Sequence, residues 1–305
     1  MTNVALLSFD TNTGKWRVTY NNRVIAASPN KHYAKRKATI EIGGIVEFTE
    51  TAMIPAPSEI ADEQFGINER FDFLSDFVRM VDDGTSASLL VTGEGGLGKT
   101  YTVNQALTEA GREPLHLESM ELGTVDDNQY FTVVKGYSTP RGLYRSLYEN
   151  RNRIMIFDDC DNILKDPVAL NLLKGALDSY DKRIISWNAM SSGEDLPTSF
   201  EFKGGVIFIS NLPLHKIDQS IRSRAIVVDL SMTTQQKIDR MEVLVTSDTF
   251  MPECSARIKR KALSFLEEMK DKARELNLRT LIKVTKVAAR GGDWKRRAEY
   301  LLTSV

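Results

Sequence analysis

A glycine-rich loop with one lysine and one threonine carries the clearest chemistry in this sequence. The loop fits G-x-x-x-x-G-K-[ST] at every fixed position and consists of Gly93, Glu94, Gly95, Gly96, Leu97, Gly98, Lys99 and Thr100. It follows an apolar run, Ser88–Thr92, and opens a helical pattern, which is the context that this motif requires. Glycines permit backbone angles that turn several N–H groups onto phosphate oxygens, and a helix N-terminus favours an anion. We therefore expect this loop, with the adjoining Tyr101, to bind a nucleoside triphosphate.

Two side chains of the loop have distinct expected roles. The Lys99 ammonium is expected to reach the β- and γ-phosphates, and the Thr100 hydroxyl to ligate Mg²⁺. The alternative is a glycine-rich turn with a chance lysine, but the order of strand, loop and helix argues against it. ATP and Mg²⁺ are therefore the expected ligands of this site.

Two neighbouring acids follow a second apolar run further along the chain. Residues 154–157 are all apolar, and Asp158 and Asp159 come directly after them. This pattern predicts a buried parallel strand whose C-terminal end delivers both acids beside the phosphates. Asp158 would hold Mg²⁺, largely through water, and Asp159 would polarise the attacking water as general base. The alternative is that both acids only cap the helix that follows.

The composition describes an ordinary globular chain without an overall preference for nucleic acid. Of the 305 residues, 42% are hydrophobic and 27% are charged, so a core of normal size can form without disulfides or metal. The formal net charge of −1 means that any contact with nucleic acid must come from local basic patches. The two cysteines, Cys160 and Cys254, lie far apart, which favours a reducing compartment. Without a signal peptide or an apolar run of membrane-spanning length, we expect a cytoplasmic protein with no membrane partner.

The pattern of apolar residues changes twice along the chain and predicts three domains. Residues 1–56 carry short alternating runs between turns and are expected to form a small β-rich domain, with a strand pair around residues 38–48. Residues 57–230 alternate helical and strand patterns, which is typical of an α/β core with a parallel sheet. Residues 231–305 have helical periodicity and no clear strand. The buried strands expected in the core are residues 88–92, 154–157, 206–210 and 225–230.

Together, these motifs resemble those of the AAA+ ATPases over roughly residues 60–302. The resemblance implies a P-loop core, a C-terminal helical lid and hydrolysis of ATP. Asn211 follows a segment that resembles the sensor-1 strand, which implies that it orients the attacking water. The segment before Arg224 resembles the one that carries the arginine finger, with Arg222 as the second candidate. Arg279 lies where sensor 2 begins a lid helix, which implies contact with the γ-phosphate.

The resemblance also implies an assembly and raises one question about the rate. The arginine finger of AAA+ proteins acts on the neighbouring subunit, so a ring or spiral homo-oligomer, usually hexameric, is expected. Asp159 departs from the family pattern, which usually has the longer Glu at this position. The departure leaves open a slow nucleotide-dependent switch instead of a fast ATPase. The short core further resembles small ATPases that bacteriophages encode.

One loop and one hairpin are expected to lie near a polymer substrate. Lys135, Tyr137 and Arg141 fall in a segment that corresponds to the pore-facing loop of AAA+ rings. An aromatic side chain with flanking cations would stack on bases or grip an extended polypeptide. Residues 183–187 and 200–203 predict a β-hairpin of the kind that some DNA-directed AAA+ proteins carry.

A basic run near the N-terminus is the second candidate for contact with a polymer. Residues 31–37 form the densest basic patch that includes an aromatic, and Lys35 and Arg36 lie at its centre. Such a patch is suited to the phosphate backbone of nucleic acid. DNA is therefore the first choice of partner, in phage replication, recombination or genome handling. An ATP-driven protein remodeller of the unfoldase class is the alternative.

Overall fold

The chain forms two compact units, residues 1–66 and residues 67–305. The computed structural model describes residues 3–10, 15–21, 23–43, 46–50, 64–115, 129–136, 139–178, 182–187 and 196–304. The predicted domain boundary at residue 56 lies outside these described residues, and the predicted division at residue 230 falls within the second unit.

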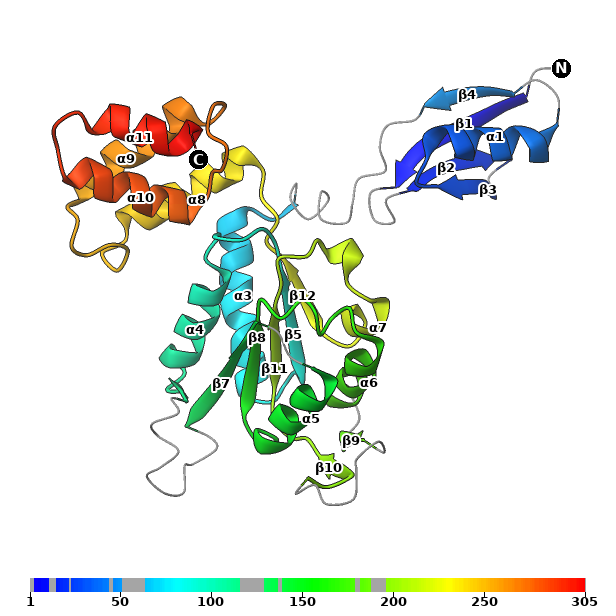
Figure 1. The fold of residues 1–305 in the computed structure, drawn as a ribbon, viewed down its shortest axis with the longest axis horizontal. Coiled ribbons are helices and arrows are strands. Elements are labelled where there is room, and N and C mark those ends of the chain that lie inside the picture. The colour runs from blue at the N-terminus through cyan, green and yellow to red at the C-terminus, as the bar shows by residue number, and fades with distance from the viewer. Residues whose placement is uncertain are drawn as a thin grey trace. The chain divides into compact units, whose positions relative to one another are not determined.

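The first unit is a four-stranded sheet with one helix packed on it (Figure 1). The strands run in the order β3-β2-β1-β4, with β1 and β4 parallel and the other neighbours antiparallel. The elements are β1 (Asn3–Asp10), β2 (Lys15–Tyr20), β3 (Arg23–Ser28), α1 (Lys31–Ile42) and β4 (Val46–Glu50). Ala5 and Leu7 alternate toward the core, where they meet Ala34 and Ala38, which lie four residues apart on one face of α1.

The strand pair predicted around residues 38–48 is wrong in its first half, because residues 31–42 form α1. The Asn30 side chain caps this helix, since its Oδ1 accepts a hydrogen bond from the Tyr33 N–H at 3.1 Å. Gly43 ends the helix with φ +73°. The β-branched residues near its end favour a strand, but the packing of two alanines on the sheet favours the helix. The basic run of residues 31–37 therefore lies on a helix.

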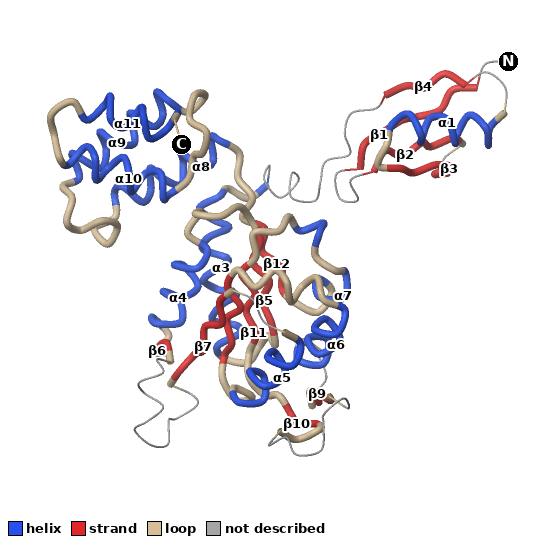
Figure 2. Tube along the Cα trace, in the orientation of Figure 1, coloured by secondary structure: helices blue, strands red, loops and turns tan. Residues whose placement is uncertain are grey.

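The second unit contains a six-stranded parallel sheet with helices on both faces (Figures 1 and 2), which confirms the predicted α/β core. Its strands run in the order β12-β5-β11-β8-β7-β6. They are β5 (Ser88–Thr92), β6 (Glu113–Pro114), β7 (Tyr130–Lys135), β8 (Ile154–Asp158), β11 (Val206–Ile209) and β12 (Ile226–Asp229). The helices are α3 (Ile67–Asp82), α4 (Lys99–Glu109), α5 (Pro140–Glu149), α6 (Pro167–Ala176), the 3-10 helix η2 (Leu214–Lys216) and α7 (Gln219–Arg222).

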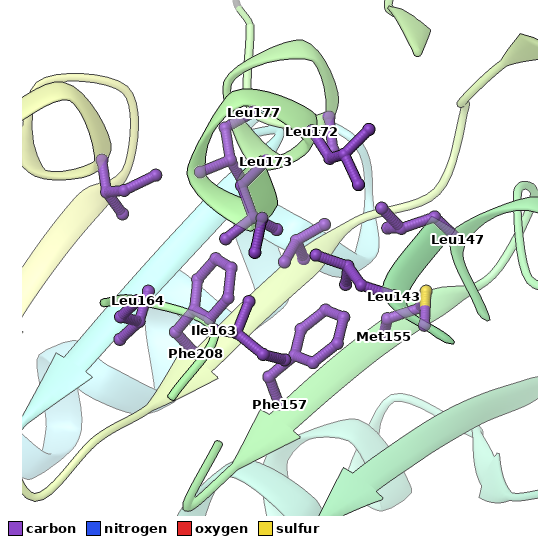
Figure 3. Close-up of a cluster of buried hydrophobic side chains, with 14 of the residues drawn as sticks. Leu143, Leu147, Met155, Phe157, Ile163, Leu164, Leu172, Leu173, Leu177 and Phe208 are labelled. Atoms are coloured by element: carbon purple, nitrogen blue, oxygen red, sulfur yellow. The ribbon is translucent and has the colours of Figure 1, made fainter. Parts of the chain in front are cut away.

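Two apolar layers explain why the central strands are continuously hydrophobic. In β5, Leu90 packs with the helices α5 and α6, whereas Leu89 and Val91 pack with α3 and α4. In the α5–α6 layer, Phe157 of β8 and Phe208 of β11 stand opposite each other and stack at 5.3 Å between ring centroids (Figure 3). Because both faces are covered, neither set of alternating residues is polar. The four strands predicted from apolar runs are confirmed as β5, β8, β11 and β12.

Two strands at one edge of the sheet are absent from the sequence prediction. β7 lies between β8 and β6, and it pairs in parallel with β8 so that Lys135 is opposite Asp158. Its sequence, Tyr-Phe-Thr-Val-Val-Lys, has the aromatic and β-branched content of a strand. The short β6 pairs only through Glu113 and Pro114, which is too little for a sequence pattern to reveal.

A β-hairpin and a close backbone contact at Gly204 precede the strand β11. β9 (Ile184–Ser186) and β10 (Ser199–Glu201) pair in antiparallel fashion, which confirms the predicted hairpin. The chain then passes through Gly204, which lies directly against the turn before β8. A Cβ on this glycine would lie 1.9 Å from the Arg153 carbonyl oxygen. This close approach lets β11 begin beside β8, so that Ile209 pairs with Asp158 at the far ends of the two strands.

We expect Gly204→Ala to lower the free energy of unfolding by about 3 kcal/mol, because the backbone itself must move to admit the methyl group. Gly66→Ala is the matched control, since a Cβ there meets nothing within 4 Å. Thermal or urea unfolding of both variants measures the difference. Equal stability of the two variants would show that Gly204 is not required for the close approach.

The last four helices form a bundle with its own apolar core. They are α8 (Thr234–Thr246), α9 (Ala256–Met269), α10 (Leu278–Ala289) and α11 (Trp294–Thr303). Phe265 of α9 and Trp294 of α11 meet edge to face at 5.4 Å, beside buried residues from all four helices. Helical structure in this segment agrees with its periodicity. Among the helices that the structure describes, none has both the length and the apolar character needed to cross a membrane.

Candidate functional site

The glycine-rich loop adopts the backbone angles for which glycine is needed. Gly98 has φ +95° and occupies the N-cap of α4 in the left-handed region. Gly93 has φ +135° and lies so close to the end of β12 that a Cβ would sit 2.9 Å from the Leu230 carbonyl carbon. Side chains at these positions would strain the loop and separate it from the sheet. The loop is thus held between β5, β12 and the first turn of α4.

Lys99 lies in the centre of this loop and is buried. Its ammonium donates hydrogen bonds to the Gly93 carbonyl at 2.6 Å, to the Glu94 carbonyl at 2.7 Å and to Asn211 Oδ1 at 3.0 Å. Burial lowers the pKa of Lys99 to about 8, although the nearby acids, Asp159 first among them, oppose this shift. The ammonium therefore has three neutral acceptors, and phosphate oxygens would be stronger partners for it.

The two acids at the end of β8 have different environments. Asp158 is buried, and its Oδ1 accepts a hydrogen bond from the Thr100 hydroxyl at 2.9 Å. Asp159 is exposed and has φ +56°, a conformation that Asp tolerates better than most residues. Its Oδ1 accepts a hydrogen bond from Asn211 Nδ2 at 2.6 Å. A third acid, Asp161, has a separate partner, because its Oδ1 accepts from the Ser210 hydroxyl at 2.6 Å.

The donor set around Thr100 and Asp158 fits a magnesium ion. A hydroxyl and a carboxylate oxygen lie 2.9 Å apart, at the foot of the loop that would hold phosphates. Magnesium prefers oxygen ligands and is commonly held by one or two carboxylates together with phosphates and water. The Lys135 ammonium also lies 3.4 Å from the second Asp158 oxygen, so this carboxylate already has a cation beside it.

A cavity of about 410 Å³ opens directly beside the loop. The α/β core lines it with Lys99, Thr100, Asp158 and Asp159, together with Asn211. The helical bundle lines it mostly with apolar side chains, namely Leu244, Phe250, Met251, Leu278 and Ile282. Polar groups from the core and apolar groups from the bundle suit a molecule that carries both phosphates and a flat, largely apolar group.

The helical bundle contacts the loop through the start of α10. The Leu278 N–H lies in the first turn of α10, where backbone N–H groups have no acceptor within the helix. It donates to the Gly96 carbonyl at 2.9 Å. The next residue, Arg279, is exposed and lines the cavity, and its charge is close enough to lower the pKa of Lys99. Arg279, the nucleotide-contacting residue predicted in the lid, therefore lies beside Lys99 of the predicted phosphate loop.

Arg240 also lines the cavity but is not among the residues predicted from the sequence. Its guanidinium carbon lies 3.9 Å from the centroid of the Phe71 ring, and Nη1 donates to Asn68 Oδ1 at 3.0 Å. Burial lowers the pKa of Arg240, with a smaller opposing effect from Asp72. No spacing rule points to this residue or to the apolar lining, because they meet the loop only through the fold.

Arg224 is not brought to the cavity of its own chain. It is exposed just after α7, where its Nη1 donates to the Ser220 carbonyl at 3.0 Å. The second candidate, Arg222, is partly buried at the end of α7. The arrangement leaves the Arg224 guanidinium at the surface.

The residues predicted to contact a polymer are scattered over the two units. Lys135 lies beside Asp158, and Arg141 is exposed in the first turn of α5. Tyr137 lies outside the described residues. On α1, the Lys35 ammonium lies 5.3 Å from the centroid of the Phe48 ring, and Arg36 is exposed.

Comparison with known proteins agrees with this geometry. Residues 89–230 match the family described as "ATPase family associated with various cellular activities (AAA)". This segment runs from β5 to the end of β12 and contains the whole glycine-rich loop, Asp158, Asp159, Asn211 and Arg224. The chain is also 29% identical over 239 residues to a protein of Enterobacteria phage T4, covering 72% of this chain and 69% of the phage protein. That protein is described as an "uncharacterized 36.7 kDa protein in nrdC-mobD intergenic region".

Proposed function

We propose that this chain, whose residues 89–230 match the AAA ATPase family, binds ATP with Mg²⁺ in the cavity beside Lys99 and hydrolyses it. One observation carries the proposal. Asn211 links Lys99 to Asp159, while Thr100 links the loop to Asp158, so that groups far apart in sequence converge at the cavity. The apolar side chains that the lid contributes to the cavity would contact the base.

Each residue has a defined part in the proposed reaction. Lys99 exchanges its carbonyl partners for the β- and γ-phosphate oxygens. Thr100 and Asp158 would hold Mg²⁺, which supplies positive charge against the phosphates. Asp159 accepts the proton of the attacking water, and Asn211 fixes the orientation of that carboxylate. Arg279 approaches the phosphates from the lid.

The short side chain of Asp159 bears on the rate. Its carboxylate is held at 2.6 Å by Asn211 and is exposed to the solvent that would supply the attacking water. This placement supports turnover. A slow nucleotide-dependent switch remains the second candidate, because Asp reaches less far into the cavity than the Glu that the family usually has.

We further propose that the protein acts as a homo-oligomer in which Arg224 completes the site of a neighbouring subunit. The exposure of Arg224 and its absence from the residues that line its own cavity support this arrangement. A guanidinium supplied from outside stabilises charge on the transferring phosphoryl group.

DNA is the proposed polymer substrate, in the handling of a phage genome. The helix α1 supports it, since it carries the four cations Lys31, Lys35, Arg36 and Lys37 against the single acid Glu41. Similarity to a phage T4 protein supports the phage setting. Charge on one helix is suited to the phosphate backbone, whatever the base sequence.

Steady-state ATP hydrolysis with added polymers tests this proposal. We expect single- or double-stranded DNA to raise the rate several-fold at low salt, and the stimulation to fall steeply as salt increases. An Arg36→Gln, Lys37→Gln variant should lose most of the stimulation but keep the basal rate. Stimulation by an unfolded polypeptide alone would support the remodeller, and no stimulation by either polymer would support the switch.

A further inference from the structure

An acid lies inside the loop that is proposed to bind phosphates. Glu94 directly follows Gly93, and its backbone carbonyl accepts a hydrogen bond from Lys99 at 2.7 Å. Its side chain is 62% exposed and ends in a carboxylate. A triphosphate bound there adds several negative charges, and like charges at this range repel one another. An unpaired Glu94 would therefore weaken the binding of nucleotide.

The lid supplies the opposite charge. Lys237, in the first turns of α8, donates a hydrogen bond of 2.5 Å from Nζ to Glu94 Oε2. The lysine side chain is only 13% exposed, so it is held by its surroundings more firmly than its partner is. These two residues are 143 positions apart in the sequence, and the ion pair joins the lid to the phosphate loop.

The position of α8 determines whether this pair forms. Arg240 lies one turn after Lys237 on the same side of α8, and it seats the helix on Phe71 and Asn68 of α3. The N-terminus of α8 is fixed by a capping box between Thr233 and Gln236. Lys237 thus moves with α8, whereas Glu94 moves with the phosphate loop. Neither residue lines the cavity, so Lys237 acts on nucleotide through Glu94 and not by contact.

We propose that Lys237 is a positioning residue that makes the affinity for nucleotide depend on the position of the lid. With α8 seated on α3, Lys237 neutralises Glu94 and the loop accepts the triphosphate. When α8 moves away, the bare Glu94 carboxylate repels the phosphates and promotes their release. This inference rests on the proposed binding of ATP at the loop.

The test is a double-mutant cycle on the dissociation constant of N-methylanthraniloyl-ATP with Mg²⁺, followed by fluorescence. Lys237→Met should weaken binding about tenfold at low salt, and less at high salt where charges are screened. Glu94→Gln should strengthen binding a few-fold, because the repulsive charge is gone. The double variant should recover most of the loss of Lys237→Met, since there is then no acid to neutralise.

Lys295→Met is the matched control. It removes a lid cation that pairs with Glu268 at 3.2 Å, within the lid, and it should not change the affinity. Binding by Lys237→Met as tight as that of the unmutated chain would overturn the inference, and so would a loss that Glu94→Gln does not rescue. If the unmutated chain binds no more nucleotide than Lys99→Ala does, the proposed function itself falls, and the inference with it.

Discussion

Replacing Lys99 with alanine is expected to abolish measurable binding of ATP and, with it, hydrolysis. Among the described residues of the loop, Lys99 carries the one side-chain cation. Its ammonium donates hydrogen bonds to the Gly93 and Glu94 carbonyls. Without it, the backbone N–H groups alone would face the triphosphate, and we expect affinity to fall by at least about a hundredfold. Equilibrium binding of ATP with Mg²⁺ measures the loss.

The same substitution should leave the protein folded. Burial lowers the pKa of Lys99 to about 8, from an ordinary value of 10.5, which means that the charged form is disfavoured in this position. Removing the ammonium relieves that cost while it removes three hydrogen bonds, so the free energy of unfolding should change by no more than about 1 kcal/mol. Lys165→Ala, at an exposed turn, is the control for loss of a lysine as such. Tight binding of ATP by Lys99→Ala would refute the phosphate-loop assignment.

Much of the core could be predicted because its signals are local. The motif at residues 93–100 requires specific residue types at fixed spacing, and the apolar runs before it and before Asp158 are buried on both faces of the sheet. The lid helix α10 lies in the segment for which periodicity predicts helices, and Asn277 caps its N-terminus. Strand ends in a parallel sheet meet at one edge, so Asp158 and Asn211 could be expected near the loop.

The parts that could not be predicted depend on contacts between distant segments. Helix α1 carries β-branched residues that favour a strand, and the packing of Ala34 and Ala38 on the sheet favours the helix instead. Arg240 and the apolar lining of the cavity have no motif of their own, since the loop and the lid meet only after folding. Lys135 illustrates the same limit, because its pairing with Asp158 follows from the register of β7 against β8.

Arg224→Ala is expected to lower the turnover number for ATP about a thousandfold while it leaves ATP binding intact. The Arg224 side chain is exposed and does not line its own cavity, so its loss should not disturb the residues that hold nucleotide. Arg222→Ala is the matched control, because it removes the neighbouring cation at the end of α7. A larger loss of turnover in Arg222→Ala than in Arg224→Ala would show that Arg222, and not Arg224, is the arginine finger.

Mixing two inactive variants distinguishes a finger that acts between subunits from a cation that acts within one. An Arg224→Ala subunit keeps Asp159, and an Asp159→Asn subunit keeps Arg224, so a mixed oligomer contains some sites with both groups. Asn tolerates the left-handed φ of +56° at this position and can still accept the hydrogen bond from Asn211, so the second variant should fold normally. We expect the mixture to regain part of the hydrolysis that each variant lacks alone. If the variants co-assemble, as native mass measurement would show, and no activity returns, Arg224 does not act on a neighbouring site.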